Sequence, residues 1–394
     1  MKPADNNRGF HELVILIAAH FLVDTIAGMV SPLWPDIEAR CGFVEGGTFW
    51  LLMIWMISTS LTQLLFGLMG ESSAGRWLLW CGPMMSALCL AAIATTTTPL
   101  TAGGLLMAGG IGIAAFHPEA ATRAGNCLPG ARSRAMSLFS TAGFVGQSVG
   151  PAISGLLVAQ YGLSGLSIGT GTALVVLLVL ALSTRLPRRQ KYAAEVFAQS
   201  SPWTVLQQNY RVVGLLLAAG VLRVIPASGI PVATAYWLKL RHLGSDEIGM
   251  VQSAFMFGIG LGGLIAAVWI THRTERLTLT TVPLAAVPCL LVFQTVSQNL
   301  LLVAMFGAGL TLGMAQPVFI SLGQQLLSAN RRFGSSITMG VSWGIGGVVV
   351  AALTDYCDRQ QNFGPAFTVY AVCIMASCAL CLRLPPAHSE STAG

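Results

Sequence analysis

Residues 12–34 read ELVILIAAHFLVDTIAGMVSPLW, and the fold of the chain depends on this stretch. A helix needs about 20 apolar residues to cross a bilayer, and the stretch is long enough to do so. Asp24 lies near its middle, and 199 residues later a second apolar stretch, residues 211–237, carries Arg223 at the equivalent position. An ionised Asp at that depth costs roughly 2.5–3.5 kcal/mol, so such residues are usually functional. The stretch therefore predicts a membrane helix with a functional acid.

The same offset aligns further Gly and Pro residues, which indicates an internal duplication. Chance alignment of apolar sequence is the alternative, but the matches lie in two separated regions and share one register. Two halves with the same number of spans and the same orientation are related by an axis along the membrane normal, as in many transporters. The further matched pairs are Pro32 with Pro231, Gly110 with Gly309 and Pro118 with Pro317.

Composition excludes a water-soluble protein. The chain of 394 residues is 54% hydrophobic and 9% charged, whereas soluble domains carry about 25% charged residues. The net charge of +6 does not indicate nucleic-acid binding, because the basic residues occur in short clusters between apolar runs, as in membrane proteins. Nine cysteines, most of them within apolar segments, are interpreted as small core residues.

Twelve apolar stretches are long enough to be spans. Backbone polar groups in lipid must be satisfied within the segment, so the stretches predict helices. The chain is therefore expected to be an all-α integral membrane protein with two pseudo-symmetric bundles of six helices. The expected spans are 12–34, 48–69, 77–96, 99–123, 134–158, 164–184, 211–237, 247–270, 277–297, 299–325, 334–354 and 365–383.

The distribution of Lys and Arg predicts the orientation. With the N-terminus inside, sixteen of these residues lie on the cytoplasmic side and four on the outer side, a bias that is large enough to set topology. Both termini are therefore expected in the cytoplasm. The predicted parts are an N-terminal bundle of residues 1–184, a cytoplasmic linker of residues 185–210 and a C-terminal bundle of residues 211–394.

His20 and Asp24 are the first candidate site residues. They are four residues apart, so they share one face of a helix, and exposing that face to lipid would be unfavourable. We expect the face to line a central cavity, where Asp24 would accept a proton and His20 would tune its affinity. The alternative is a structural ion pair or a hydrogen bond to a neighbouring helix.

Arg223 is the second candidate, because its guanidinium stays protonated and suits carboxylate, phosphate or phosphonate groups. From the duplication we expect it to face Asp24. It would either be neutralised by Asp24 in the empty state or bind an anionic substrate that displaces this pairing. The alternative is a fixed salt bridge that holds the two halves together.

The third candidate is residues 116–120, with the sequence FHPEA. Pro118 is expected to kink the helix and to leave a carbonyl free, while His117 and Glu119 flank the kink. Glu119 can pair with Arg123 four residues later, near the cytoplasmic mouth, in either a functional or a local structural role. A metal site is not expected, since no HExxH motif or histidine cluster supports one.

The second half keeps the proline of this segment but loses its ionisable residues, because the equivalent residues are Gln316 and Pro317. Proton chemistry is therefore expected in the first half, where His117 and Glu119 would form a second proton or gating station. His117 and Gln316 are also candidates for binding the substrate, Gln316 as a hydrogen-bonding residue. Trp34 and Tyr236 end the first and seventh spans. They are candidates for closing a substrate cavity, although an interfacial aromatic belt would place the same residue types there.

These motifs resemble those of the major facilitator superfamily, and more narrowly those of fosmidomycin-resistance-type efflux proteins. Span five resembles the antiporter motif of proton-driven exporters, in which glycines are expected to allow close packing where the halves meet and a proline to bend the helix. The residues that carry the resemblance are His20-x-Leu22-x-Asp24, Gly110-x-Gly112-x-x-x-Phe116-His117-Pro118-Glu119, Ser137-x-Phe139 and Gly143-x-x-Gly146-x-x-x-Gly150-Pro151.

The resemblance implies two six-helix bundles, alternating access, a basic residue in span seven and export driven by inward proton flow. The chain departs from the family pattern between spans two and three, where Glu71 replaces the usual Asp and Arg76 is the remaining Arg. Gln325 also replaces an acid that often caps span ten. The gate at the inner side is therefore expected to differ from that of the family.

We expect a bacterial inner-membrane antiporter that exchanges protons for a small polar or anionic compound. The alternatives are uptake by symport or facilitated diffusion, an intramembrane enzyme and a membrane sensor that does not transport. The chain lacks the nucleophile or metal motif of an enzyme and the soluble output domain of a sensor. We expect the partners to be substrate, protons and the lipid bilayer, with no cofactor and no nucleic acid, and the protein to be a monomer.

Overall fold

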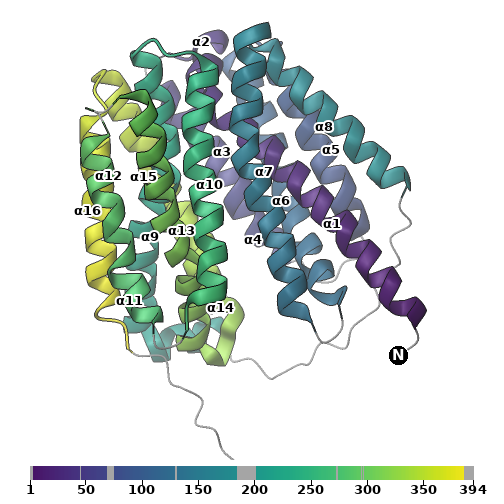
Figure 1. Cartoon of the computed structure of the whole chain (residues 1–394), viewed down its shortest axis with the longest axis vertical. Coiled ribbons are helices and arrows are strands. Elements are labelled where there is room, and N and C mark those ends of the chain that lie inside the picture. The colour runs from purple at the N-terminus through teal and green to yellow at the C-terminus, as the bar shows by residue number, and fades with distance from the viewer. Residues whose placement is uncertain are drawn as a thin grey trace, which may run out of the picture.

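The computed structural model describes residues 3–44, 46–68, 75–128, 131–183, 201–271, 274–293, 295 and 297–385. These residues contain helices and connecting turns but no strand, and Figure 1 shows the helices as long, roughly aligned rods. In chain order the elements are α1 (Pro3–Val30), η1 (Ser31–Leu33), α2 (Trp34–Cys41), α3 (Gly47–Met56), η2 (Ile57–Leu61), α4 (Thr62–Leu68), α5 (Gly75–Ile93), α6 (Pro99–Asn126), α7 (Arg132–Tyr161), α8 (Ser164–Ser183), α9 (Pro202–Leu240), α10 (Ser245–Trp269), α11 (Glu275–Thr280), η3 (Val282–Ala285), α12 (Ala286–Val292), α13 (Gln298–Leu326), η4 (Ser328–Asn330), α14 (Arg331–Ser335), η5 (Ser336–Val341), α15 (Ser342–Arg359) and α16 (Gly364–Cys381).

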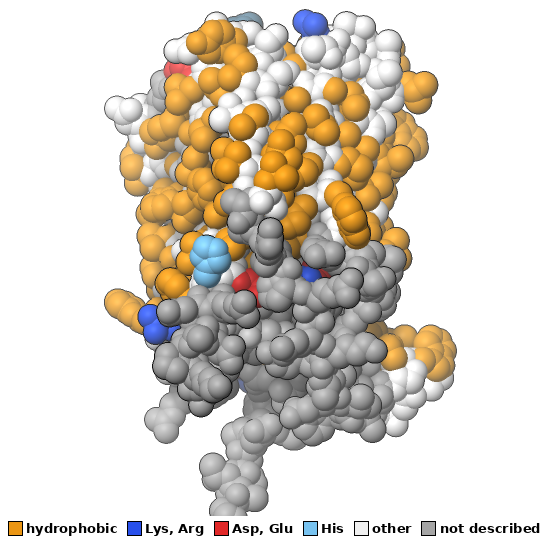
Figure 2. Space-filling view, turned by 90° about the vertical axis from the view of Figure 1, so that its right-hand side faces the viewer, with side chains coloured by type: hydrophobic (Ala, Val, Ile, Leu, Met, Phe, Trp, Pro, Cys, Tyr) orange, Lys and Arg blue, Asp and Glu red, His pale blue; other side chains and the backbone are white. Residues whose placement is uncertain are grey.

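The helices match the twelve expected spans in order and position. Within the described ranges, ten helices are long and apolar enough to cross a membrane. Two shorter apolar helices, Gly47–Leu61 and Trp77–Ile93, occupy the second and third expected spans. Hydrophobic side chains cover most of the described surface on the face shown in Figure 2, as contact with lipid requires. The expected all-α membrane fold is confirmed.

The two halves contact each other through two pairs of helices, and the internal duplication relates one pair to the other. α7 packs along α10, and α15 packs along α3. Shifted by the offset of 199 residues, α7 becomes the region of α15, and α3 with α4 becomes α10. Both α3–α4 and α14–α15 contain a π-helical segment, η2 and η5, and these two segments touch. The expected bounds of the two bundles and the linker stay predictions. α9 is interrupted at Asn209, within the expected linker.

Two of the motif glycines hold α7 against α1. A Cβ atom on Gly146 would lie 2.2 Å from the carbonyl oxygen of Phe21, and one on Gly150 would lie 2.5 Å from that of Thr25. Only glycine allows the two backbones to approach this closely. The expectation that these glycines pack where the halves meet is wrong, because α1 and α7 belong to the same half. The residue of this motif that does reach the other half is Pro151, whose carbonyl lies against Gly249 of α10.

We expect Gly146→Ala to lower thermal stability in detergent, because its methyl group has no room against the backbone of α1 and overpacking costs about 1–3 kcal/mol. Gly104→Ala is the matched control, because Gly104 lies on α6 with nothing within 4 Å of an added Cβ. There the alanine should be neutral or stabilising, since Ala favours a helix over Gly by about 1 kcal/mol. Equal melting temperatures for the two variants would contradict the packing assigned to α1 and α7.

Candidate functional site

Asp24 lies between two histidines that come from different helices. Its Oδ2 atom is 3.3 Å from Nε2 of His20 on α1, and its Oδ1 atom is 3.1 Å from Nε2 of His117 on α6. The His20 side chain is 8% exposed, that of Asp24 14% and that of His117 21%. The cluster is therefore largely shielded, but Asp24 and His117 keep some contact with solvent.

Backbone carbonyls fix the orientation of both imidazole rings. Nδ1 of His20 is 2.8 Å from the carbonyl oxygen of Phe139 on α7, and Nδ1 of His117 is 2.9 Å from that of Ile113. The His20 ring also stacks on the Phe139 ring at 4.0 Å and meets the His117 ring edge-on at 5.3 Å. Each ring therefore turns its Nε2 atom toward Asp24.

Local sequence explains how three helices assemble this cluster. His20 and Asp24 share a face of α1 through their spacing of four residues. His117 directly precedes Pro118, which lies inside α6, and it bonds the carbonyl four residues back. Gly143 of α7 lies directly against the cluster, because a Cβ atom there would be 2.5 Å from Asp24 Oδ2 and from His20 Cε1. The sequence pattern identified Gly143 as part of a motif but not its place at this site.

His20, Asp24 and His117 form a compact group that can share a cation. Their potential ligand atoms all lie within 4.8 Å of one another. A proton needs only the two short contacts described above, whereas a metal ion would need all three atoms to converge on it. The histidine cluster that the sequence pattern lacked is therefore formed by the fold.

A second charged cluster lies further along α1 and α6. Nε of Arg123 donates to Oε1 of Glu119 over 2.7 Å, and Arg123 Nη1 lies 3.6 Å from Oε1 of Glu12 on α1. The side chains of Arg123 and Glu119 are 6% and 8% exposed. Sequence reasoning anticipated the pairing of Glu119 with Arg123 but missed Glu12. The signal for Glu12 was weak, since a spacing of eight residues turns it about 80° around α1 from His20.

Arg223 is buried inside the C-terminal half and does not pair with Asp24. Its Nη2 atom lies 3.3 Å from the carbonyl oxygen of Leu279 and 3.6 Å from Sγ of Cys381, and its guanidinium lies 5.1 Å from the centre of the Phe319 ring. It is 4% exposed, and its Nε and Nη1 atoms have no hydrogen-bond partner among the described residues. Within the described part of the chain, this guanidinium is a buried charge without a carboxylate beside it.

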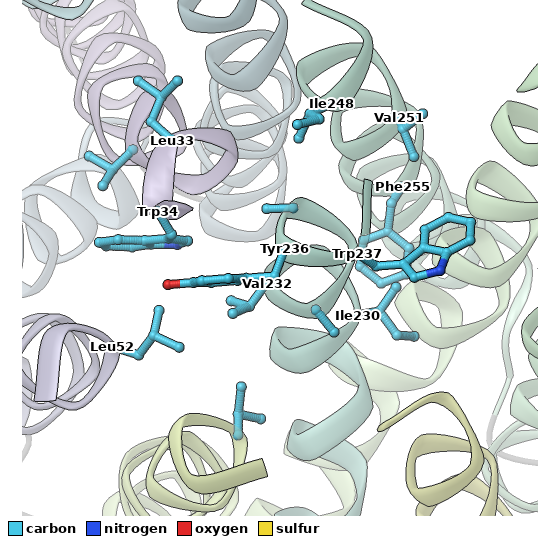
Figure 3. Packing of buried hydrophobic residues seen from close by; sticks show 14 of the residues in the cluster. Leu33, Trp34, Leu52, Ile230, Val232, Tyr236, Trp237, Ile248, Val251 and Phe255 are labelled. Atoms are coloured by element: carbon cyan, nitrogen blue, oxygen red, sulfur yellow. The ribbon is translucent and has the colours of Figure 1, made fainter. Parts of the chain in front are cut away.

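Trp34 and Tyr236 lie in the core rather than on the membrane-facing surface. They are 2% and 3% exposed and belong to one hydrophobic cluster, and Figure 3 shows their rings next to each other between the two halves. Tyr236 donates a hydrogen bond of 2.9 Å to Glu38 in α2. Their burial excludes an interfacial belt for these two residues and places them where α2 meets α9.

Polar contacts between the halves surround this aromatic pair. Lys239 of α9 lies 2.5 Å from Asp36 of α2, and Ser245 of α10 donates to the same carboxylate over 3.2 Å. The amide of Gln252 on α10 donates to the carbonyl oxygens of Ser31 and Pro231. We call this set, together with Trp34, Tyr236 and Glu38, the outer closure, because it joins the halves at the end that is expected to face outward.

The remaining predicted residues have less defined positions. Gln316 is half-buried on α13. Pro317 is exposed and lies in the same helix, away from its ends. Gln325 donates a hydrogen bond of 3.0 Å to Ser321. Glu71 lies outside the described residues, and Arg76 lies in the first turn of α5 with a side chain that is also outside them. The gate role of Glu71 and Arg76 stays a prediction.

Comparisons with known proteins agree with this architecture. The family model of the Major Facilitator Superfamily matches residues 16–351. The fosmidomycin resistance protein of Escherichia coli (strain K12) is 22% identical over 364 residues, covering 90% of this chain and 87% of the relative.

Two solved structures have the same fold. A bacterial homologue of the human lysosomal transporter Spinster, in an inward-facing and unoccupied conformation, superposes with a TM-score of 0.67 at 14% identity, covering 98% of this chain and 95% of that chain. A mutant of the nucleoside transporter NupG superposes with a TM-score of 0.74 at 13% identity, covering 95% and 98%. At these identities the likeness concerns the fold alone.

We expect Arg123→Met to lower thermal stability strongly, because the buried carboxylate of Glu119 and the half-buried carboxylate of Glu12 would lose their guanidinium. Breaking a buried pair costs about 3–5 kcal/mol. Thermal unfolding of the purified protein in detergent measures the loss.

Arg211→Met is the matched control for this prediction. Arg211 is exposed on α9 and donates to the hydroxyl of Tyr210, so its loss strands no buried carboxylate. A loss of stability in Arg123→Met that is no larger than in the control would contradict a buried charge cluster between α1 and α6.

Proposed function

Because the chain belongs to the Major Facilitator Superfamily, we propose that it is an antiporter that exports a small polar or anionic compound in exchange for protons. It is a multi-pass membrane transporter that moves a small molecule and is not an enzyme. The direction of transport, the coupling to protons and the class of substrate are the proposed part.

The position of Asp24 between two imidazoles carries the proposal. A carboxylate inside a membrane span is unfavourable when it is ionised and isolated, so it either binds a proton or pairs with another polar group. Imidazole is the side chain whose charge changes most readily near neutral pH. The cluster is also partly exposed through His117 and Asp24. Together these features support a group that takes up a proton on one side of the membrane and releases it on the other.

Arg223 supports an anionic or polar substrate. The transfer of a charge into a low-dielectric interior costs several kcal/mol unless a counter-charge compensates it. The guanidinium has a cation–π contact and one donating nitrogen, but two of its nitrogens lack partners among the described residues. A carboxylate, phosphate or phosphonate on the substrate would supply the missing charge. Binding at Arg223 would require α9, α11, α13 and α16 to admit the substrate, since the side chain is 4% exposed.

Export is supported by the curated relative, whose name records resistance to fosmidomycin. A resistance protein of this fold removes its compound from the cell most simply by transport outward. We propose the same direction here, with Glu119 and Arg123 as a second proton or gating station toward the inner end. Tyr236, Trp34 and Gln316 would contact the substrate as the two halves move.

Growth inhibition gives the first test of substrate class. Cells with and without the protein are exposed to phosphonates, organic acids and hydrophobic drugs. We expect expression to raise the tolerated concentration of at least one polar or anionic compound by several-fold. Protection against hydrophobic drugs alone, with none against polar or anionic compounds, would contradict the proposed substrate class.

We expect Asp24→Asn to abolish proton-driven transport of the compound found in that screen, because the amide cannot exchange a proton. The measurement uses proteoliposomes with a trapped pH indicator and an imposed pH gradient, and we expect at least a tenfold loss of rate. Asp246→Asn is the control, since Asp246 lies in the first turn of α10, away from the cluster. Wild-type exchange in Asp24→Asn, or substrate movement without proton movement in the wild type, would overturn the proposal.

We expect Arg223→Gln to weaken transport of anionic compounds at least tenfold while neutral compounds of similar size are less affected. The reason is that Gln fills the site without its positive charge. Initial rates over a range of concentrations separate a change in KM from a change in maximal rate. An equal loss for charged and neutral compounds would indicate a purely structural role for Arg223.

A further inference from the structure

The hydrogen-bond pattern of the two histidines determines where their protons lie. A backbone carbonyl oxygen can only accept a hydrogen bond. Because Nδ1 of His20 faces the carbonyl of Phe139 and Nδ1 of His117 faces that of Ile113, each Nδ1 atom carries a proton. A neutral ring holds a single N–H proton, so the Nε2 atom of each ring would then be a bare lone pair.

Both Nε2 atoms, however, face a group that also accepts. They lie 3.3 and 3.1 Å from the two carboxylate oxygens of Asp24, which are acceptors when the group is ionised. The contact of His117 has the geometry of a hydrogen bond, and that of His20 is an ion-pair contact. A lone pair beside a carboxylate oxygen at either distance is repulsive, and a proton on the ring or on the carboxyl group removes the repulsion in that contact.

We infer that the cluster of His20, Asp24 and His117 takes up two exchangeable protons, one in each contact between Nε2 and a carboxylate oxygen. Without them the cluster carries one negative charge and has two repulsive contacts. With one proton it is neutral and keeps one such contact, and with two protons it carries one positive charge and neither contact is repulsive.

The charged neighbours of the cluster do not change this count. α7 faces the cluster with the ring of Phe139 and the backbone of Gly143. After Arg134, the only ionisable residue in the sequence of α7 is Tyr161. α6 carries Glu119 and Arg123 beyond His117, and α1 carries Glu12. These three residues bond one another rather than the cluster. Asp24 is therefore the carboxylate that compensates the two protons within the cluster, which keeps one net positive charge.

The consequence for transport rests on the proposed function. If Asp24 couples protons to export, one turn of the cycle can exchange two protons rather than one. His117 would exchange with solvent more readily, because it is 21% exposed whereas His20 is 8% exposed. The second half has no equivalent cluster, since Ala219, Arg223 and Gln316 occupy the positions related to the three residues by the offset.

Magnetic resonance of the purified full-length protein tests the inference without a substrate. Histidines are labelled with ¹⁵N and aspartates with ¹³C, and the protein is titrated in detergent with a chelator present. His20→Gln and His117→Gln assign the two rings among the six histidines of the chain. The number of protons held by the two Nε2 atoms and the Asp24 carboxyl group should rise from zero to two as pH falls, while both Nδ1 atoms remain protonated.

Asp24→Asn is the matched variant. Its amide can donate to one Nε2 atom without any bound proton, so we expect no more than one proton to be taken up. A wild-type count that stops at one, or a ring with its neutral-state proton on Nε2, would overturn the inference. So would ring signals that change when the chelator is added to protein purified without it, because a metal ion would then hold the two Nε2 atoms. A count of two with no proton-coupled transport would contradict only the proposed function.

Discussion

The charge of Asp24 within a membrane helix is the constraint on which the rest of the site depends. Water is scarce at that depth, so the protein itself must supply the compensating groups. His20 supplies one from the same helix and His117 supplies the other from α6. The rings can do this only because the backbones of α6 and α7 hold them by their far nitrogens. Compensation of the single carboxylate of Asp24 thus links α1, α6 and α7.

Close packing of α1 on α7 follows from the same constraint. His20 can reach the carbonyl of Phe139 only where the two helices almost touch, and Gly143, Gly146 and Gly150 create that approach. A larger side chain at Gly143 would displace the carboxylate itself. The glycines of the antiporter-like motif therefore position the carboxylate of Asp24 in addition to packing the helices.

Much of the fold could be predicted from sequence because membrane helices follow hydrophobic length. The twelve spans were placed from apolar runs alone, and the pairing of Glu119 with Arg123 followed from a spacing that any helix preserves. Such predictions succeed because they depend on one helix at a time.

The rest depends on how helices are rotated against one another, which the sequence pattern does not show. Duplication placed Arg223 and Asp24 at equivalent positions, but their side chains enter different surroundings. Glu12 and Gly143 were missed for the same reason, since each acts on a residue of another helix. Trp34 and Tyr236 are residue types that are common in an interfacial belt, but they are buried where α2 meets α9.

The outer closure shows what kind of contact can hold the two halves together temporarily. The side chains of Lys239 and Asp36 are 42% and 20% exposed, so water already solvates part of both charges. A pair of this kind stabilises by about 0–1 kcal/mol, and dissolved salt weakens it further. Gln252 adds a hydrogen bond to the carbonyl of Ser31 in the other half, which water can replace once the end opens. Separation of Lys239 from Asp36 therefore exchanges a protein contact for hydration of similar strength. Ionic strength thus becomes a physical variable that shifts this contribution to the balance between the closed and open forms.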